Sequence, residues 1–570
     1  MDRQWLINRT NPEFIQYLSK EASVSPILAQ VLVNRGIKNR GIKDAESAKK
    51  FLSPLLEYLH DPFLLNDMEQ AVQRVANAVN HNETVLVHGD YDADGVTSAA
   101  ILVYSLRMMG LKVLYHIPNR ITEGYGVSMK GVEKAADNGA GLIITADCGI
   151  TSHEQIDAAS ARGIDVIVTD HHQPSESLPD AVAVIDPHRK DSIYPFQYLA
   201  GVGVAFKLVQ ALCRTLKDRC QHLRTEELLD LVALGTIADS VPLVDENRIF
   251  VTYGLKQLNS DTCRTGIREL KDSAALDRAF RSELLSYTLI PRINAAGRLH
   301  DAGEVVELFL TEDRAKAKGI AGLLNEQNRK RKGIETTVFN SALKMIEAEE
   351  PEHAIVLHSP EWHPGVIGIV ASRLVDMFHK PVFLFSVTDS VAKGSSRGIP
   401  SFHLFNAIKE CSHMLLGYGG HKQAAGLKIE VAQLPAFKER INSIAEKYLS
   451  DEAGRPTLEI DAAVRLRDIN FTLIKEISLM EPFGESNREP VFGAKDIHIL
   501  NHRVVGNNHL KMQLRQERTH MDTIGFSMGK SMERIGPDEA LDIAFVPAVN
   551  EWNGMRNLQL NLKAIRPGAQ

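Results

Sequence analysis

Cysteine is scarce and scattered in this sequence. The 570 residues include five cysteines, an odd number with no paired metal-binding spacing: Cys148, Cys213, Cys220, Cys263 and Cys411. A disulfide framework uses an even set of closely repeated cysteines, so the pattern favours reduced thiols in a cytosolic protein.

Long apolar runs are absent as well. No stretch approaches the length that spans a bilayer, and residues 1–6, MDRQWL, lack the apolar core of a signal peptide. We therefore expect a cytoplasmic protein. The hydrophobic fraction of 44% and the charged fraction of 24% are ordinary for globular chains, and the length suits two to four domains.

Positive charge is not in excess. The net charge of −7 gives no global sign of nucleic-acid binding. It does not exclude such binding, because a carboxylate-rich metal site is acidic and a basic channel can be local.

What the sequence does have is a cluster of acidic residues directly after an apolar run. Residues 85–95, VLVHGDYDADG, bring His88, Asp90, Asp92 and Asp94 one after another and then reach a glycine. Three carboxylates this close repel one another unless a cation lies among them. A solvated acidic turn is the alternative, but the apolar run and the histidine favour a site for divalent cations.

Short apolar runs alternate with amphipathic stretches from about residue 66. The pattern predicts strands at 84–88, 111–117, 142–147 and 165–170, and helices at 67–79, 96–109, 130–138 and 153–162. Buried-type strands that alternate with helices predict a parallel sheet with helices on both faces. In such sheets ligands collect at the carboxyl ends of the strands.

Aspartates and histidines end three more apolar segments. Asp147 follows 142–146, Asp170-His171-His172 follows 166–169, and Asp239 follows 231–238. An isolated aspartate in such a place can cap a helix, and a histidine pair can lie in a surface loop. Four apolar elements that end in Asp or His at one edge of a sheet are better explained by a shared site.

The residue types in this set narrow the metal and the chemistry. Carboxylates and imidazoles without thiolates suit Mn²⁺, or Mg²⁺ where water completes the coordination, better than structural Zn²⁺. One divalent ion does not balance so many carboxylates. We expect a pair of ions about 3.5–4 Å apart, bridged by one aspartate, as in sites that hydrolyse phosphate esters.

The pattern of predicted secondary structure changes twice in the rest of the chain. Residues 311–350 predict a long connecting helix. Its basic cluster, NRKRK at 328–332, has two interpretations: it lines a path for a nucleic acid, or it forms a charged face exposed to solvent. Residues 354–430 form a second α/β segment with glycine-rich stretches at 393–398 and 417–426. After residue 456, alternation at 509–516 and 558–562, with a tight-turn signal at Asn553-Gly554, indicates a β-rich domain.

These motifs resemble the DHH phosphoesterase superfamily. Its four motifs match HGDYDADG at 88–95, Asp147, the DHH triplet at 170–172 and Asp239, while SSRG at 395–398 and GYGGH at 417–421 resemble its DHHA1 domain. The order, with PRINAAGR at 291–298, resembles the RecJ family of bacterial 5′ to 3′ single-strand-specific DNA exonucleases from about residue 50 onward. Tyr418 departs from that family, where many relatives carry glycine, and this puts the local loop shape in doubt.

The resemblance implies roles for the acidic residues and histidines. Asp147 would bridge two ions, and the remaining metal ligands would be His88 and Asp92 for one ion and Asp94, His171 and Asp239 for the other. Asp90, Asp170 and His172 would be catalytic partners that orient ligands or the attacking water. Spacing alone leaves open whether Asp90 or Asp92 coordinates directly.

The resemblance also implies a pocket for a terminal phosphate. The matching positions are Arg120, Arg298, Ser395 and Arg397, with His421 in a glycine-rich loop. Tyr125 would stack on a base. The alternatives are an Arg120 that pairs with a nearby acid, a plain turn at Gly419-Gly420, and a buried Tyr125.

Together these observations predict an α/β protein of several domains. The predicted parts are an N-terminal helical segment at 1–50, a parallel-sheet DHH catalytic domain at 51–305, a connecting helix at 306–350, a smaller α/β DHHA1 domain at 351–450 and an OB-like β-barrel at 451–570. The predicted function is metal-dependent 5′ to 3′ degradation of single-stranded DNA in repair and recombination.

The resemblance further implies a monomer that works with a DNA helicase and a single-strand-binding protein and has no membrane partner. One rival is a phosphodiesterase for short RNA or dinucleotides. Another is a catalytically silent single-strand-binding scaffold.

Overall fold

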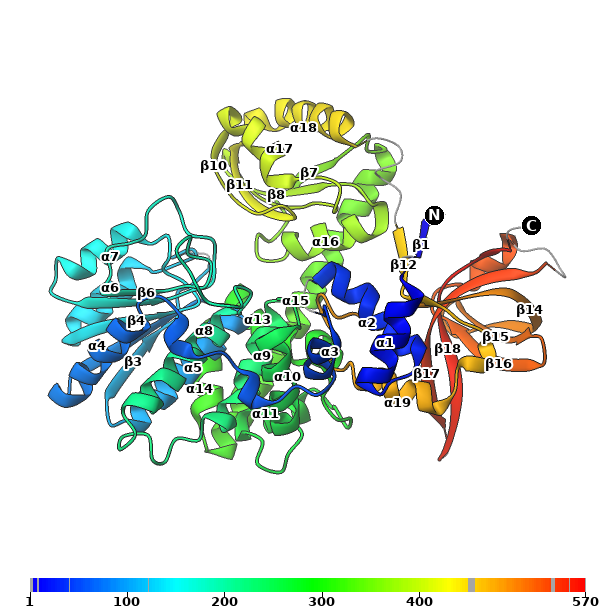
Figure 1. The fold of residues 1–570 in the computed structure, drawn as a ribbon. Helices are drawn as coiled ribbons and strands as arrows, with labels where there is room; N and C mark the ends of the chain where they lie inside the picture. Colours follow the sequence, from blue (N-terminus) through cyan, green and yellow to red (C-terminus); the bar gives the residue numbers. More distant parts are fainter. Residues whose placement is uncertain are drawn as a thin grey trace.

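The computed structural model describes residues 4–7, 10–39, 42–120, 122–449, 457–534, 539–552 and 554–568. A parallel-sheet domain and a helical layer lie on one side of the molecule, a second α/β domain lies above them, and a β-barrel with the N-terminal helices lies on the other side (Figure 1). Within the described ranges, none of the helices combines the length and the apolar character that crossing a membrane requires.

The first sheet is parallel throughout, as the sequence predicts. Its strand order is β3-β2-β4-β5-β6. The strands are β2 (Thr84–Gly89), β3 (Lys112–His116), β4 (Ala140–Ala146), β5 (Asp165–Thr169) and β6 (Ala183–Ile185). Alternate residues of β2 enter two cores, because successive side chains of a strand point to opposite faces: Val85 and Val87 enter one core and Leu86 the other.

Helices cover both faces of this sheet. One face packs on α4 (Met68–His81), α5 (Ala93–Met108) and α8 (Gly201–Thr215), and the other on α6 (Met129–Asp137) and α7 (His153–Ser160). The parallel strands are buried on both sides, which explains their continuous apolar runs.

A helical layer follows the sheet. Its helices are α9 (Leu229–Ala238), α10 (Asp245–Leu258), α11 (Thr265–Ser273), α12 (Ser282–Tyr287), α13 (Leu289–Leu299) and α14 (Gly303–Leu310). The expectation that all four acid-bearing elements end at an edge of the sheet is wrong for Asp239, which lies at the end of α9. Every residue of α9 except its last, Ala238, is buried, and an apolar run without periodicity does not distinguish helix from strand.

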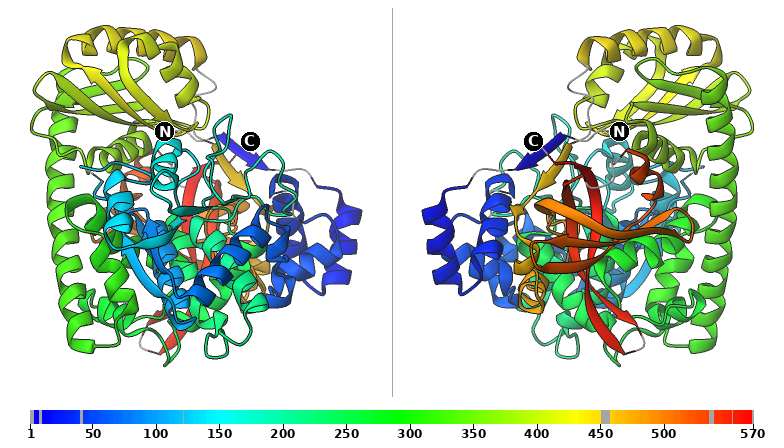
Figure 2. Two further views of the ribbon diagram at one scale, coloured as in Figure 1. Left: turned by 90° about the vertical axis from the view of Figure 1, so that its left-hand side faces the viewer. Right: turned by 90° about the vertical axis from the view of Figure 1, so that its right-hand side faces the viewer.

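The predicted connecting helix is α15 (Arg314–Ala348), whose 35 residues span about 52 Å at 1.5 Å per residue. Figure 2 shows it as one long column that joins the helical layer to the second α/β domain. The basic cluster is divided: Arg331 is buried and donates to Asn328 and Glu335, whereas Lys330 is exposed and pairs with Glu326.

The second α/β domain has a mixed sheet of order β10-β11-β9-β8-β7, in which only β7 and β8 are parallel among its described pairings. Its elements are β7 (Ile355–Ser359), α16 (Ile367–Phe378), β8 (Val382–Thr388), β9 (Val391–Arg397), α17 (Leu404–Glu410), β10 (Leu415–Gly420), β11 (Ala424–Glu430) and α18 (Leu434–Tyr448). The glycine-rich stretch 417–426, expected as a loop, is mostly the β10–β11 hairpin.

The C-terminal strands close into a barrel, because β14 pairs with both β15 and β17. The barrel strands are β14 (Phe492–Val505), β15 (His509–Gln516), β16 (Thr519–Gly525), β17 (Leu541–Trp552) and β18 (Met555–Pro567). The predicted alternating stretches lie in β15 and β18. Asn553 lies outside the described residues, but β17 and β18 pair up to Trp552 and Met555, which flank it.

The N-terminal helices share one apolar core with this barrel. They are α1 (Pro12–Ala22), α2 (Pro26–Asn39) and α3 (Ala45–Leu52). Leu18 and Leu28 belong to the same buried cluster as Leu510 and Leu541 of the barrel and Leu473 of α19 (Phe471–Ser478). The first and last parts of the chain therefore form one packed unit.

Arg248 of α10 ties this unit to the helical layer. Its fully buried guanidinium donates to the carbonyl oxygens of Leu479, Met480 and Glu481 at 2.7–2.9 Å and to that of Phe51 at 2.8 Å. It also stacks on the Phe51 ring at 4.1 Å. Burial lowers the pKa of Arg248 to about 9 against the opposing charge of Glu481, and the direct partners of the guanidinium are these carbonyl oxygens.

We predict that Arg248→Met lowers the stability of the full chain by about 3 kcal/mol or more, because several buried carbonyls lose their donor at once. Calorimetric melting and limited proteolysis measure this, and cleavage near residue 480 should accelerate. Arg281→Met is the matched control, since Arg281 is exposed and only approaches Glu481 at 4.0 Å. Equal melting temperatures for the two variants would show that Arg248 does not hold the joint.

Candidate metal centre and phosphate pocket

The acidic motifs converge where β2, β4 and β5 end. Asp90 follows β2, Asp147 follows β4, and Asp170 follows β5. Parallel strands bring their carboxyl ends to one edge, so residues far apart in sequence become neighbours. Asp239 joins them from the end of α9, with its carboxylate 3.6 Å from His171 Nε2.

Backbone donors hold two of the carboxylates. Asp92 is the N-cap of α5, and its Oδ1 accepts the N–H groups of Asp94 and Gly95 at 3.0 and 3.1 Å. Asp94 lies in the first turn of α5 and accepts the N–H groups of Gly201 and Val202 at 2.7 and 2.9 Å. These last two donors belong to the first turn of α8, so two helix N-termini face the acidic cluster.

Asp147 is central and holds an unusual backbone conformation. Its φ of +64° is left-handed, which an aspartate adopts more readily than most residues. Its Oδ1 lies 3.2 Å from His171 Nε2. Within the described residues, Asp90 Oδ1, Asp147 Oδ1 and His171 Nε2 are all buried without a hydrogen-bond partner.

The potential ligand atoms fall into overlapping groups whose members lie within 4.8 Å of one another. The groups are Asp90, Asp92 and Asp147; Asp94, His171 and Asp239; and Asp147, His171 and His172. Buried oxygen and nitrogen atoms without hydrogen bonds, gathered at this spacing, fit hard divalent cations. Asp147 occurs in two groups, as a bridging carboxylate would.

The pKa values of the carboxylates record their crowding. Burial, and next the charge of Asp239, raises the pKa of Asp94 to about 7. Burial and Asp92 raise the pKa of Asp239 to about 7. Burial and neighbouring carboxylates also hold the pKa values of Asp90 and Asp147 well above their usual range. A cluster of this kind needs positive charge if it is to stay ionised.

Asp170 differs from the other aspartates because its hydrogen bonds are complete. Its oxygens accept from the N–H groups of Ile150 and His171 at 2.9 and 2.8 Å and from Nδ1 of His172 at 2.7 Å. Burial opposes its ionisation, yet the bond from His172 and the nearby histidines lower its pKa.

The bond to Asp170 favours the protonated form of His172. Burial opposes the charged form, but the bond to Asp170 raises the pKa of His172 to about 9. The hydroxyl of Tyr125 lies 2.9 and 3.3 Å from the two ring nitrogens of His172. Tyr125 is exposed and thus available to a ligand.

The surroundings of His88 differ from those of the aspartates that follow it in the sequence. Its ring is fully buried, and Nε2 accepts the N–H of Ser128 at 3.1 Å. Burial and the neighbouring His116 lower the pKa of His88 to about 3. His88 belongs to none of the ligand groups among the described residues, whereas Asp90 does.

Sequence reasoning missed two glycines that make room for this centre. A Cβ on Gly201 would lie 2.4 Å from Asp147 Oδ1, and a Cβ on Gly235 would lie 2.4 Å from Thr97 Oγ1 and 2.7 Å from Asp94 Oδ1. Helices α8 and α9 approach the carboxylates closely only because these positions lack side chains. A glycine within a helical pattern was the available signal, but it does not reveal what the glycine faces.

A second cavity, of about 410 Å³, gathers the expected phosphate-binding residues. Arg120, Arg298, Ser395 and Arg397 all line it, together with Lys393 and one glycine each from β9, β10 and β11. Burial and the neighbouring arginines lower the pKa of Arg298 to about 10, and burial with Arg120 lowers that of Arg397. Neither Arg298 nor Arg397 forms an ion pair within the described residues, so the cavity favours an anion.

His421 does not line this cavity, although the adjacent Gly420 does. It is exposed in the turn between β10 and β11, where its N–H donates to the carbonyl of Ala424 at 2.8 Å. Tyr418 is part of β10, and its ring lies 5.9 Å from that of Phe405.

The cavity and the acidic cluster meet at Tyr91. The Arg120 guanidinium stacks on the Tyr91 ring at 5.2 Å. Helix α13 packs on the same segment: Asn294 accepts the N–H of Ala93 at 2.8 Å, and a Cβ on Gly297 would lie 2.1 Å from the Tyr91 carbonyl. The next residue of α13, Arg298, donates to the carbonyl of Gly365 at 2.8 Å in the second α/β domain.

Comparisons with known proteins agree with this architecture. Family models match at residues 84–236 (DHH family, N-terminal domain), 352–447 (DHHA1 domain) and 460–564 (RecJ OB domain). The single-stranded-DNA-specific exonuclease RecJ of Bacillus subtilis is 37% identical over 98% of this chain and 70% of its own length.

Two crystal structures of RecJ from Thermus thermophilus cover the whole of this chain. The complex with Mn²⁺ has a TM-score of 0.85 at 30% sequence identity, and the match covers 80% of the length of that RecJ chain. The complex with Mg²⁺ has a TM-score of 0.79 at 28% identity and is covered over 79%. The sequence identity over nearly the full chain shows that this protein belongs to the RecJ family.

Proposed function

We propose that this chain is a metal-dependent exonuclease that shortens single-stranded DNA from its 5′ end. The observation that carries the proposal is the pairing of a carboxylate cluster with an arginine-lined cavity across one residue, Tyr91. A cation site next to a phosphate site fits cleavage of a phosphodiester bond close to a chain end. The relatives' printed names support single-stranded DNA as the substrate. The 5′ polarity rests on the family resemblance.

The ligand groups suggest how two ions would be held. Asp90 and Asp92 would hold one, Asp94, His171 and Asp239 would hold the other, and Asp147 would lie between them. A pair of Mn²⁺ or Mg²⁺ ions supplies an activated water and charge stabilisation for the phosphate oxygens. We assign Asp90 rather than His88 to the first group, because Asp90 lies within 4.8 Å of the other potential ligand atoms and His88 belongs to no such group among the described residues.

The chain's own residues have separate tasks at the reacting phosphate. His172, which Asp170 orients through Nδ1, lies beside the acidic cluster and would donate a hydrogen bond to a phosphate oxygen. Arg397 and Arg298 would bind the terminal phosphate, and Arg120 would close over it. Exposed Tyr125 would stack on a base, which needs no sequence preference.

The remaining proposals concern the setting of the enzyme. We propose a role in DNA repair and recombination, in the cytoplasm, as a monomer that acts with a helicase and a single-strand-binding protein. The OB-like barrel would bind the part of the single-stranded DNA that extends away from the bound 5′ end. These proposals rest on the family resemblance.

We predict that Asp147→Asn abolishes Mn²⁺ binding and lowers the rate of strand degradation by a factor on the order of 10³. The same variant should melt at a higher temperature than the wild type in the absence of metal, because one repelling charge is gone. Asp157→Asn, on the exposed face of α7, is the control. Calorimetric titration, melting curves and end-labelled single strands measure these effects. Activity equal to that of the wild type would refute the metal-site assignment.

We predict that Asp90→Asn removes one bound Mn²⁺ per chain, whereas His88→Gln retains the wild-type number. The glutamine carbonyl can accept the Ser128 N–H in place of the imidazole. Metal content after gel filtration distinguishes the two variants. Loss of an ion from His88→Gln, with Asp90→Asn unchanged, would assign the ligand role to His88 instead.

We predict that Arg397→Ala weakens binding of 5′-phosphorylated strands by about tenfold, equivalent to 1.4 kcal/mol, and weakens binding of 5′-hydroxyl strands much less. Lys428→Ala removes the same charge from the exposed face of β11 and is the control. Fluorescence anisotropy with strands of identical sequence measures both affinities. Equal losses for the two strands would exclude Arg397 as a terminal-phosphate contact, and faster degradation from the 3′ end would overturn the proposed polarity.

A further inference from the structure

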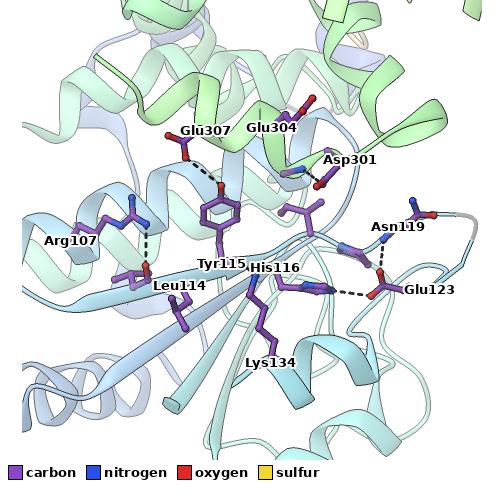
Figure 3. A pocket seen from close by; sticks show the side chains of 15 residues that line it. Arg107, Leu114, Tyr115, His116, Asn119, Glu123, Lys134, Asp301, Glu304 and Glu307 are labelled. Atoms are coloured by element: carbon purple, nitrogen blue, oxygen red, sulfur yellow. Dashed lines mark hydrogen bonds and ion pairs between the residues drawn. The ribbon is translucent and has the colours of Figure 1, made fainter. Parts of the chain in front are cut away.

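The segment between β3 and α6 carries both Arg120 and Tyr125, yet much of it is exposed. Asn119, Arg120 and Thr122 are exposed, and together with Glu123 they form what we name the Arg120 turn. A cavity of about 690 Å³ borders this turn at Asn119 and Glu123 (Figure 3). The described residues of the turn are held on that side by polar contacts.

Glu123 supplies most of these contacts. Its Oε1 accepts the N–H of Asn119 at 3.1 Å, and its Oε2 lies 2.9 Å from His116 Nε2, as Figure 3 shows. Its own N–H donates to the carbonyl of Asn119 at 2.8 Å. The two ends of the turn are thereby joined twice, through the backbone and through the carboxylate.

The carboxylate also anchors the turn to the sheet. His116 is the last residue of β3 and pairs in register with His88 of β2. Ser128 Oγ lies 3.2 Å from His116 Nε2, and the Ser128 N–H donates to His88. A continuous polar chain therefore runs from the Arg120 turn, through Glu123, His116 and Ser128, to the strand that delivers the acidic cluster.

We propose that Glu123 is a positioning residue for recognition of the 5′-terminal phosphate. By fixing the Arg120 turn against β3, it would hold the Arg120 guanidinium over Tyr91 at the mouth of the arginine-lined cavity. Glu123 lines the large cavity and not the phosphate cavity, so it acts through Arg120 rather than by contact with the strand. This inference rests on the proposed phosphate pocket.

The test is a set of steady-state measurements on 5′-phosphorylated and 5′-hydroxyl single strands of one sequence with Mn²⁺. Glu123→Ala should raise the KM for the phosphorylated strand by about tenfold, the factor that 1.4 kcal/mol represents, and leave kcat and the hydroxyl strand nearly unchanged. Glu123→Gln keeps an acceptor for the Asn119 N–H and should show a smaller loss. Lys130→Ala is the control, because Lys130 is exposed and only approaches Glu123 at 3.9 Å.

A double-mutant cycle shows whether Glu123 works through Arg120. In an Arg120→Ala chain, adding Glu123→Ala should change the phosphate preference no further. A persistent effect in that background, or equal losses on both strands, would overturn the inference. Melting temperature and Mn²⁺ binding confirm that each variant folds. If Glu123→Ala does not fold, Glu123→Gln replaces it in the same double-mutant cycle. A wild-type chain without any phosphate preference would refute the phosphate pocket itself, a result distinct from an unaffected Glu123→Ala.

Discussion

Mutual repulsion among buried carboxylates is the constraint on which this site depends. Asp90, Asp94 and Asp147 lose most of their hydration at the sheet edge, and next to one another they cannot all remain charged without help. The chain offers only partial help, through N–H groups at the starts of α5 and α8. Two glycines bring α8 and α9 closer to the carboxylates than any other residue would allow. The fold thus maintains a charge deficit that divalent ions would fill.

The same constraint explains why the second α/β domain lies where it does. An acidic centre by itself repels a phosphate chain, so a substrate needs positive charge close by. Helix α13 provides the connection: Gly297 packs on the backbone between the acidic residues, and Arg298 turns toward the second domain, where Arg397 lies. Tyr91 lies between charges of opposite sign, and within the described residues no ion pair joins the two groups.

Much of this arrangement follows from the sequence. The strands of the parallel sheet have short apolar runs buried on both faces, and their carboxyl ends must meet, so Asp147 and the Asp170-His171-His172 triplet could be placed together. The family resemblance pointed to Arg120, Arg298, Ser395 and Arg397, which line one cavity and which no local pattern indicates.

Other features could not be predicted from the sequence for physical reasons. The position of Asp239 at the end of a helix is one of them, because α9 is buried almost throughout and has no polar face to reveal its period. The different surroundings of His88 and Asp90 depend on Ser128, which is 40 residues from His88 in the sequence. The sharing of a core between α1, α2 and the barrel depends on contacts across more than 400 positions, as between Asn34 and Asp461. No periodicity records a contact of that range.

The shared core also determines the order in which parts of the chain can fold during synthesis. Helices α1 and α2 emerge from the ribosome before the parallel sheet, and until the barrel strands follow, Leu18 and Leu28 can pack only within the N-terminal helices. At 5–20 residues per second, that interval lasts roughly half a minute to two minutes. During it the nascent chain exposes an unpaired apolar face while its catalytic domain is already complete. This segment is therefore the one that a chaperone would protect longest.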